Sequence, residues 1–442
     1  MTRAFISAGI FLTESLNHKY KKEAQDCASF LYLWYNNRKA AIIPDYGQGD
    51  AFAKLAPAPM ANYTISTAWI WYNNNHKTVA EIQVEMGNFV RTPEMTSTER
   101  VMAAINGTPF DVYPAISVTS VATIDGMNQS GVYFPSAHTN GAEMADLAAV
   151  GHDEYGFDSA APYFSIHLEA AALGADVDWS DRFGTPSVRG ILLSNLDQLD
   201  IPQDFLSRPL PMQLLRALRI LHKRYKGEVP VIGKVVGPWT LAYHLRGVEN
   251  LLLDTILEPQ KTRSAIAALA EISIQFAQAQ FEAGADIVVW ADHVTSDLVS
   301  AQIYREIVFP VHCMATRKLA PLGPLILHVC GNVEDRFDLF AQAGFTCFHM
   351  DSRNNIPAIV QAAGRRIRLA GCINNPFTLS QGTPGGVQRE VEYNMACGIS
   401  LIAPECAIPT SVPTANLKEL VRTAHSHRFG GAPNMRPTQK SS

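Results

Sequence analysis

The sequence has little of what marks nucleic-acid-binding, secreted or membrane proteins. Of its 442 residues 17% are charged, the net charge is −5, and no cluster of lysine and arginine stands out. We therefore expect neither a nucleic acid nor an anionic membrane as a partner. The apolar run at residues 4–12 lacks a small-x-small cleavage pattern and is too short to cross a bilayer, so we expect neither a signal peptide nor an anchor. The expected partner is a small molecule or another protein.

Cysteine is scarce and unevenly placed. The seven cysteines are an odd number, and six of them fall in the last third of the chain. This distribution does not fit the disulfide framework of a secreted protein. We therefore expect free thiols and a cytoplasmic location.

Three side chains have the chemistry of metal ligands: His328, Cys330 and Cys406. The first two follow the apolar run 325–327, and residues two apart on a strand point to the same side. Cys406 follows a second apolar run, 399–403. One imidazole and two thiolates form the ligand set of a catalytic zinc site, with one tetrahedral position left for water or substrate. The alternative is that the cysteines are small buried hydrophobic residues and the histidine an ordinary polar one.

From about residue 230 onward, short apolar runs alternate with helical segments such as 262–283 and 333–343. Alternation of this kind predicts βαβ units and a parallel sheet. The chain has room for two more strands between about residue 110 and residue 195, which would bring the total to eight. The pattern therefore predicts a closed (β/α)8 barrel. The six predicted strands are 229–236, 285–291, 324–329, 345–350, 367–373 and 398–403.

The candidate site residues gather at the ends of these predicted strands. Asp292, His328 with Cys330, Asp351 and Cys406 each lie at or just past a strand end. In a (β/α)8 barrel the chemistry takes place at the carboxyl ends of the strands. The barrel prediction therefore strengthens the metal prediction.

The barrel is expected to begin near Met95, where Thr96 to Glu99 form a capping-box pattern ahead of a helical segment. We therefore expect the chain to consist of an N-terminal extension at 1–94, a barrel domain at 95–428 and a flexible tail at 429–442.

The extension has a composition of its own, rich in asparagine and aromatic residues. Its stretch 34–39 partly recurs as 71–77, but two copies are too few to indicate a repeat protein. Two interpretations stay open: an accessory segment, or an upstream stretch wrongly joined to a native start at Met95.

About three quarters of the chain, from Met95 to Arg428, resembles the uroporphyrinogen decarboxylase superfamily. Within it, the chain is similar to the zinc-dependent methylcobamide:coenzyme M methyltransferases, whose zinc signature is a His-x-Cys with a distant cysteine. The matching stretches are 98–107, 137–140, 282–286, 327–333, 375–379 and 401–406.

This resemblance implies a TIM barrel of the uroporphyrinogen decarboxylase type, with zinc held by His328, Cys330 and Cys406. It also implies two catalytic candidates. Asp351 stands where relatives have an acidic residue that approaches the metal, although it also fits a helix N-cap. Asp292 matches an acidic strand end that binds substrate or orients the site, although it equally fits a structural carboxylate at a loop.

The function implied by the resemblance is transfer of a methyl group from a methylated corrinoid to a thiol such as coenzyme M. Zinc would make the thiol a nucleophile by removing its proton. We expect the corrinoid to arrive on a separate, transiently docked protein, because the chain contains no Asp-x-His-x-x-Gly run to supply a lower cobalt ligand.

Two other functions stay open. One is decarboxylation of a tetrapyrrole, but the stretch 113–122 contains no arginine where the parent decarboxylase presents guanidinium groups to substrate carboxylates. The other is a non-catalytic carrier in which zinc only ties two strand ends together. A tight fourth ligand from Asp351 would favour this last function, since structural zinc sites close with four protein ligands.

Overall fold

The computed structural model describes residues 68–69, 81–82 and 95–429. The chain divides into two units, Met1–Pro93 and Glu94–Ser442. In the first unit the structure describes one antiparallel strand pair, β1 (Ala68–Trp69) with β2 (Glu81–Ile82). The apolar run 4–12, the recurring tryptophan stretches and the tail from residue 430 lie outside the described residues, so the predictions made for them stay predictions.

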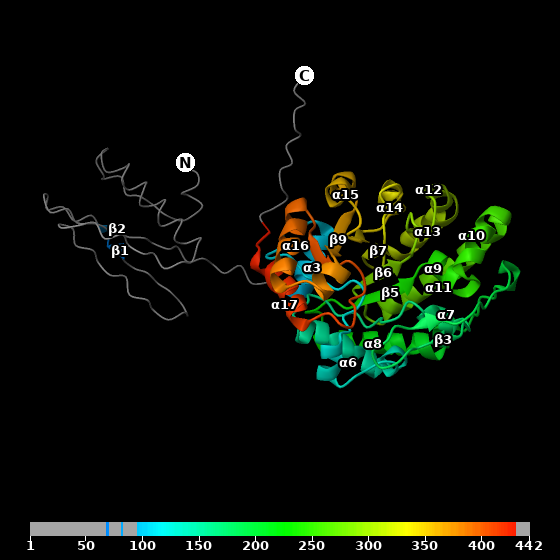
Figure 1. Ribbon diagram of the computed structural model, residues 1–442, viewed down its shortest axis with the longest axis horizontal. Helices are drawn as coiled ribbons and strands as arrows, with labels where there is room; N and C mark the ends of the chain where they lie inside the picture. The colour runs from blue at the N-terminus through cyan, green and yellow to red at the C-terminus, as the bar shows by residue number, and fades with distance from the viewer. Residues whose placement is uncertain (1–67, 70–80, 83–94, 430–442) are drawn as a thin grey trace, which may run out of the picture. The chain divides into compact units, whose positions relative to one another are not determined.

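A parallel sheet of six strands forms the centre of the second unit (Figure 1). Its strands pair in sequence order, as expected for successive βαβ units, and nearly every strand residue is buried. Strands buried on both faces appear in a sequence as continuous apolar runs, which is why these six could be predicted. They are β5 (Ile232–Val236), β6 (Ile287–Ala291), β7 (Leu325–Val329), β8 (Cys347–Met350), β9 (Arg368–Ile373) and β10 (Leu401–Pro404).

Two extended segments close the sheet between β10 and β5. Ala115 forms a parallel bridge with Ile402 of β10, and Ala160 forms one with Val231 next to β5. Side chains replace part of the missing ladder here: the backbone N–H of Ala115 donates to the Asp158 carboxylate at 2.9 Å. The predicted eight-stranded barrel is therefore confirmed in its closure, but two of its strand positions are single bridges in the part of the chain that the structure describes.

Helices surround the strands, as Figure 1 shows. The first begins at the predicted capping box, with Thr96 and Glu99 bonding each other's backbone N–H groups. The helices are α3 (Ser97–Asn106), α4 (Ile124–Ser130), α5 (Ser136–Thr139), α6 (Gly141–Asp153), α7 (Leu168–Ala172), α8 (Pro209–Tyr225), α9 (Pro238–Arg246), α10 (Val248–Leu257), α11 (Pro259–Glu282), α12 (Ala301–Ile303), α13 (Phe309–Leu319), α14 (Phe337–Ala343), α15 (Ile356–Ala363), α16 (Pro384–Cys397) and α17 (Thr414–Ser426), with π-helical turns at Tyr304–Val308 and Asn375–Ser380.

The inside of the barrel is filled by apolar side chains that alternate along the strands. Ile232, Ile287, Ile326, Cys347 and Leu401 belong to one buried cluster. The residues two places further along these strands point to the same interior, one layer closer to the carboxyl ends. Polar side chains begin in that layer.

None of the described helices combines the length and the apolar character needed to cross a membrane.

Candidate metal centre

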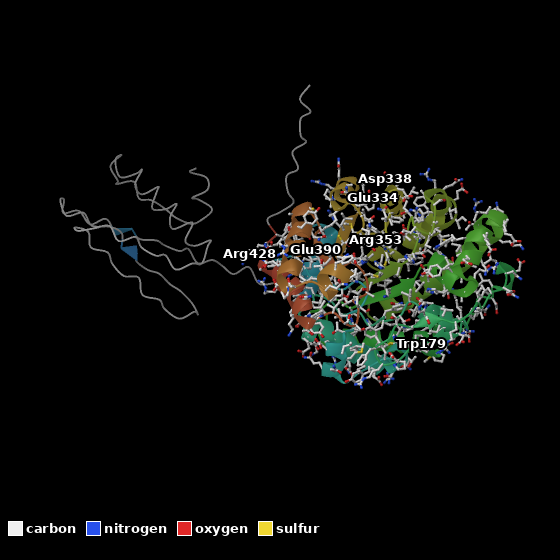
Figure 2. All side chains as sticks on the ribbon, viewed as in Figure 1. Trp179, Glu334, Asp338, Arg353, Glu390 and Arg428 are labelled. Carbon is white, nitrogen blue, oxygen red and sulfur yellow. The ribbon has the colours of Figure 1, made fainter. Side chains whose placement is uncertain are left out.

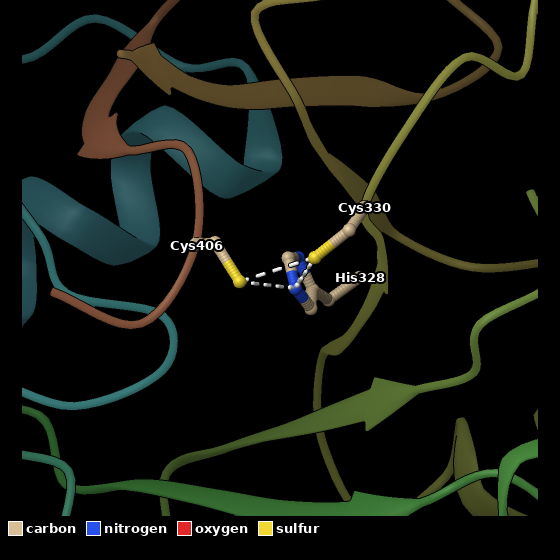
Figure 3. Close-up of side chains that lie close together, drawn as sticks. All are labelled: His328, Cys330 and Cys406. Carbon is tan, nitrogen blue, oxygen red and sulfur yellow. Dashed lines mark hydrogen bonds between the residues drawn. The ribbon is translucent and has the colours of Figure 1, made fainter. Parts of the chain in front are cut away.

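The structure brings the three predicted ligands together at the carboxyl ends of β7 and β10 (Figure 3). Cys330 Sγ lies 3.2 Å from His328 Nε2 and 3.1 Å from Cys406 Sγ. The third separation, from Cys406 Sγ to His328 Nε2, is 3.6 Å. Residues 76 positions apart in the sequence therefore meet at one point.

The donor set fits a thiophilic divalent cation. In a tetrahedral zinc site the edges between sulfur and nitrogen or sulfur ligands measure about 3.5–3.8 Å. The measured separations of 3.1–3.6 Å reach this range or fall slightly below it. His328 is buried, while Cys330 and Cys406 are partly buried as whole residues.

The two thiols share a proton in this arrangement. Their mutual hydrogen bond raises the pKa of Cys330, which burial raises further, and lowers the pKa of Cys406 well below its ordinary value. A divalent cation carries the charge that would let both sulfurs ionise. The chemistry of the pair is that of a metal ligand set.

A second histidine fixes which nitrogen of His328 faces the sulfurs. His349, fully buried on β8, places its Nε2 2.8 Å from the carbonyl oxygen of Pro404 and its Nδ1 2.8 Å from His328 Nδ1. The carbonyl can only accept, so His349 Nε2 donates. Burial and the neighbouring His328 lower the pKa of His349 well below its usual value, so its Nδ1 is unprotonated and accepts from His328 Nδ1–H. The Nε2 lone pair of His328 is thus left for a metal.

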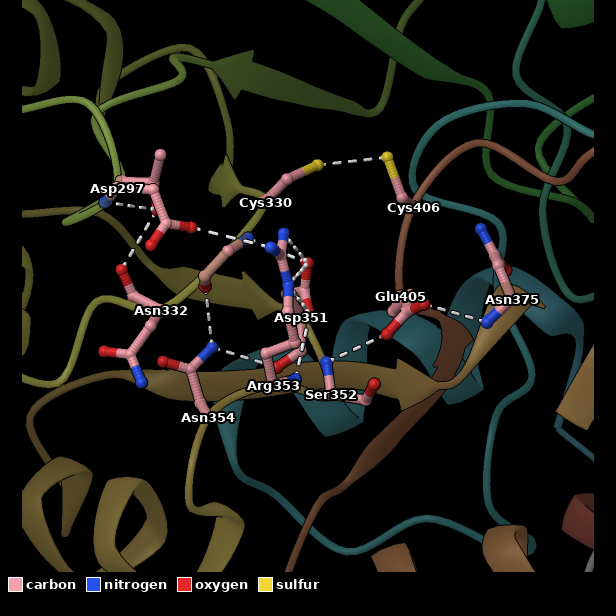
Figure 4. A network of polar contacts seen from close by, with 12 residues as sticks. Asp297, Cys330, Asn332, Asp351, Ser352, Arg353, Asn354, Asn375, Glu405 and Cys406 are labelled. Carbon is pink, nitrogen blue, oxygen red and sulfur yellow. Dashed lines mark hydrogen bonds and ion pairs between the residues drawn. The ribbon is translucent and has the colours of Figure 1, made fainter. Parts of the chain in front are cut away.

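The loop that carries Cys330 is held by polar contacts (Figure 4). Gly331 has a φ of +87°, a conformation that side chains rarely adopt, and this lets the chain turn directly after the cysteine. Its backbone N–H donates to Asp351 at 2.8 Å, and its carbonyl accepts from the Asn354 amide at 2.9 Å. These contacts hold Cys330 over the end of β7.

Asp351 is part of this support and lies beside the ligand group. Burial alone would raise its pKa, but hydrogen bonds from Arg353 and from the Gly331 N–H lower it below the ordinary value. The carboxylate therefore stays ionised while both oxygens are engaged by Arg353 and the loop. The N-cap of α15 is Asn355, so Asp351 does not cap that helix.

The loop that carries Cys406 is held through its neighbour Glu405. This buried carboxylate accepts the backbone N–H groups of Ser352 at 3.0 Å and Asn375 at 2.9 Å, which follow β8 and β9 (Figure 4). Burial is the largest cause of its raised pKa. Glu405 thus ties the second thiol to the ends of β8 and β9, and residues after β8 also support the first thiol.

Asp292 is engaged elsewhere. Its carboxylate accepts the backbone N–H of Thr240 at 2.8 Å and faces His312 Nε2 at 2.9 Å, and the side chain is completely buried. These contacts join the end of β6 to the start of α9 and to α13. They are the contacts of a structural carboxylate, and a catalytic role for Asp292 stays a prediction.

Sequence reasoning missed His349 and Glu405. Each had a signal: His349 lies on a predicted strand two residues before Asp351, and Glu405 directly precedes a predicted ligand. A histidine within an apolar strand nevertheless looks like an ordinary core residue, and the contact with Pro404 is not visible in the sequence.

Comparison with known proteins gives a consistent result. The family model for uroporphyrinogen decarboxylase (URO-D) matches residues 96–427. The chain is 31% identical over 332 residues to the methylated-thiol–coenzyme M methyltransferase of Methanosarcina mazei, covering 74% of this chain and 89% of the relative. It is 31% identical over 331 residues to the methylcobamide:CoM methyltransferase MtaA of Methanosarcina barkeri, covering 74% of this chain and 97% of that protein.

A solved structure shares the fold. A methyltransferase from Methanosarcina mazei superimposes with a TM-score of 0.72 at 30% identity, covering 75% of this chain and 99% of the other. The family match over residues 96–427 includes the strand ends where His328, Cys330 and Cys406 meet. The chain belongs to the uroporphyrinogen decarboxylase family.

Proposed function

We propose that this protein transfers a methyl group from a methylated corrinoid to a thiol such as coenzyme M, with zinc held by His328, Cys330 and Cys406. The observation that carries the proposal is the meeting of one imidazole and two thiols at the barrel mouth, with separations of 3.1–3.6 Å. The printed names of the relatives, methylcobamide:CoM and methylated-thiol–coenzyme M methyltransferase, support the reaction class.

Zinc fits this site better than a hard cation does, because thiolate and imidazole are the ligands it prefers. When bound, zinc lowers the pKa of a coordinated thiol, so that the sulfur is a nucleophile at neutral pH. With His328, Cys330 and Cys406 as its three protein ligands, a zinc ion would be able to bind the acceptor sulfur as well. His349 keeps the Nε2 lone pair of His328 available, and the contacts of Asp351 and Glu405 keep the two cysteines in place.

The methyl donor is a corrinoid on a partner protein that docks transiently over the barrel mouth. The acceptor sulfur attacks the methyl carbon, the cobalt keeps the electron pair of the broken bond, and the thiol proton passes to solvent. We propose a cytoplasmic location, since the six cysteines among the described residues are free thiols and the ligand thiols must remain reduced.

Decarboxylation of a tetrapyrrole is the weaker candidate. The stretch 113–122 forms the first strand position of the barrel and contains buried Ser117, Thr119 and Ser120 but no arginine. It therefore offers no guanidinium group to bind several carboxylates.

The test is a metal analysis of the purified protein followed by an assay with methylcobalamin and coenzyme M. We expect about one zinc per chain and loss of the methylcobalamin absorbance in proportion to methylated thiol. Protein stripped of metal by a chelator should be inactive and should recover on addition of zinc. Full activity of the metal-free protein would refute the proposal.

A further inference from the structure

A lysine lies inside the barrel close to the candidate metal centre. Lys234 is the third residue of β5 and is 4% exposed. Ile232 on the same strand packs with Ile326 of β7 in the interior cluster. Because side chains alternate along a strand, Lys234 and His328, each two residues further on, both face the interior one layer closer to the carboxyl ends. The lysine thus points into the layer that contains the metal ligands.

The backbone of Lys234 is fixed from outside the barrel. The Gln280 side chain on α11 accepts the Lys234 backbone N–H at 2.8 Å and donates to its carbonyl at 2.8 Å. Gln280 is itself fully buried. The glutamine side chain satisfies the backbone groups that a neighbouring strand would otherwise bond, so the Cα atom of Lys234 is held in place.

The ammonium group of Lys234 has no direct counter-ion. Its Nζ lies 4.6 Å from the centroid of the Tyr163 ring, a weakly favourable contact. Among the residues that the structure describes, no carboxylate lies within 4.0 Å of it and no hydrogen bond to it is found. Glu169 is the acidic group nearby, but its oxygens are taken by the Tyr163 hydroxyl and the Val236 N–H. An anionic ligand would supply the counter-ion that this ammonium group lacks.

Burial and the titratable groups around Lys234 shift its pKa in opposite directions. Burial lowers its pKa to about 8, whereas the Cys406 thiol, Glu169 and the Cys330 thiol oppose this shift. The neighbouring His349 is neutral. Lys234 is therefore protonated at neutral pH.

The other cation near the ligands is already neutralised. Arg353, which is labelled in Figure 2, forms ion pairs with Asp351 at 2.9 Å and with Asp297 at 3.5 Å. Its side chain is 59% exposed. An anionic ligand at the metal centre would therefore be repelled by carboxylates on the Arg353 side and attracted on the Lys234 side.

We propose that Lys234 binds the acidic group of the acceptor thiol and so selects thiols that carry a sulfonate or a carboxylate. The proposal rests on the proposed methyl transfer to a thiol and adds the side chain that determines which thiols are accepted. The thiol sulfur would lie beside Cys330 and Cys406. The acidic group would lie beside Lys234 and become the counter-ion of its ammonium group.

The test compares three thiols: 2-mercaptoethanesulfonate, 3-mercaptopropionate and uncharged 2-mercaptoethanol. The zinc-loaded protein, Lys234→Met and Lys234→Gln would each be assayed for methyl transfer from methylcobalamin and for thiol binding by calorimetry. We expect the unsubstituted protein to prefer an anionic thiol by about 10- to 100-fold, through KM more than kcat, and both variants to lose that preference. The two acidic thiols show whether sulfonate or carboxylate is favoured. Lys318→Met, which removes an exposed lysine paired with Glu271, is the matched control.

The outcomes separate this proposal from the proposed function. If the unsubstituted protein methylates none of the thiols but binds the anionic ones through Lys234, the function fails and the binding role stands. If the variants keep the preference for anionic thiols and only their thermal midpoint changes, Lys234 only compensates the charge of Glu169 within the fold. That result would overturn the proposal. If neither variant folds, the unsubstituted protein still decides, because the preference must fall as the pH passes the pKa of Lys234.

Discussion

Two carboxylates at equivalent places in the barrel have different surroundings. Asp292 is the first residue after β6, and Asp351 is the first after β8; the strand between them, β7, carries His328. Asp292 is sealed against Thr240 and His312, whereas Asp351 bonds the turn that carries Cys330. A position at a strand end brings a carboxylate to the mouth of the barrel but does not decide which side of the strand it faces.

The alternation of side chains explains the difference. Ala291 of β6 pairs in register with His328, which pairs in register with His349. These residues face the interior, so Asp292, one place after Ala291, turns outward to the helices. Asp351, two places after His349, stays on the interior side. Parity along the strand thus separates a carboxylate that joins helices from one that supports the site.

The largest effect is expected from removal of a ligand on the interior side. Cys406→Ala should lose its zinc and all methyl transfer, since two remaining ligands cannot hold the metal against a chelator. Metal analysis after dialysis measures it. Cys397→Ala, at the end of α16, removes a thiol that is not in the ligand group and should keep its zinc. Retention of one zinc per chain by Cys406→Ala would contradict the assignment.

A smaller effect is expected from His349→Phe, which keeps an aromatic ring in the interior layer but cannot accept from His328 Nδ1–H. The imidazole would then be free to rotate or to place its proton on Nε2, and zinc affinity should fall about 10- to 100-fold. Competition with a zinc-binding dye gives the dissociation constant. An unchanged constant would show that His328 is oriented by other contacts.

The two carboxylates themselves provide a crossed test. Asp292→Ala leaves Thr240 and His312 without their partner and should lower the free energy of unfolding by about 1–3 kcal/mol, with little change in zinc affinity. Asp351→Ala frees the turn at Gly331 and should weaken zinc binding about tenfold. Denaturant unfolding and metal competition on both variants measure the pair. If zinc affinity falls more in Asp292→Ala, the distinction drawn from strand parity is wrong.

The smallest effect concerns pH. The preference for an anionic over an uncharged thiol should be full near pH 7 and should decline as the pH rises through about 8, where Lys234 loses its proton. The sign follows because burial lowers the pKa of this lysine, so that its cationic form is present only below that value. Each thiol ionises with its own pKa, so each kcat/KM value is corrected for the measured ionisation of that thiol before the ratio is taken. In Lys234→Arg the ratio should stay constant up to pH 9.5.

Much of the barrel could be predicted from the sequence because its strands are buried on both faces. Such strands need continuous apolar residues, and all six runs became strands. The sequence did not show that the first two strand positions would be single bridges. Their backbone N–H groups bond the side chains of Asp158 and Ser159 instead of a neighbouring strand. Those partners lie 43 and 42 residues away in the sequence and form no local pattern.

The candidate metal ligands could be singled out by their chemistry, whereas the residues that support them could not. His328, Cys330 and Cys406 could be recognised because histidine and cysteine are typical metal ligands and all three lie at the ends of predicted strands. His349 and Lys234 lie within apolar strands and resemble core residues until the interior layer is assembled. Once it is known that Ile287 and Val289 of β6 face the interior, the alternation of side chains predicts that Asp292 faces the helices instead.

The separation of the ligands along the chain sets the order in which the protein can be completed. His328 and Cys330 leave the ribosome together, but Cys406 follows 76 residues later, about 4 to 15 s at ordinary rates of synthesis. Until then a nascent chain offers one imidazole and one thiol, too few to retain zinc against cellular thiols. We therefore expect a metal to be acquired only after β10 has docked beside β9.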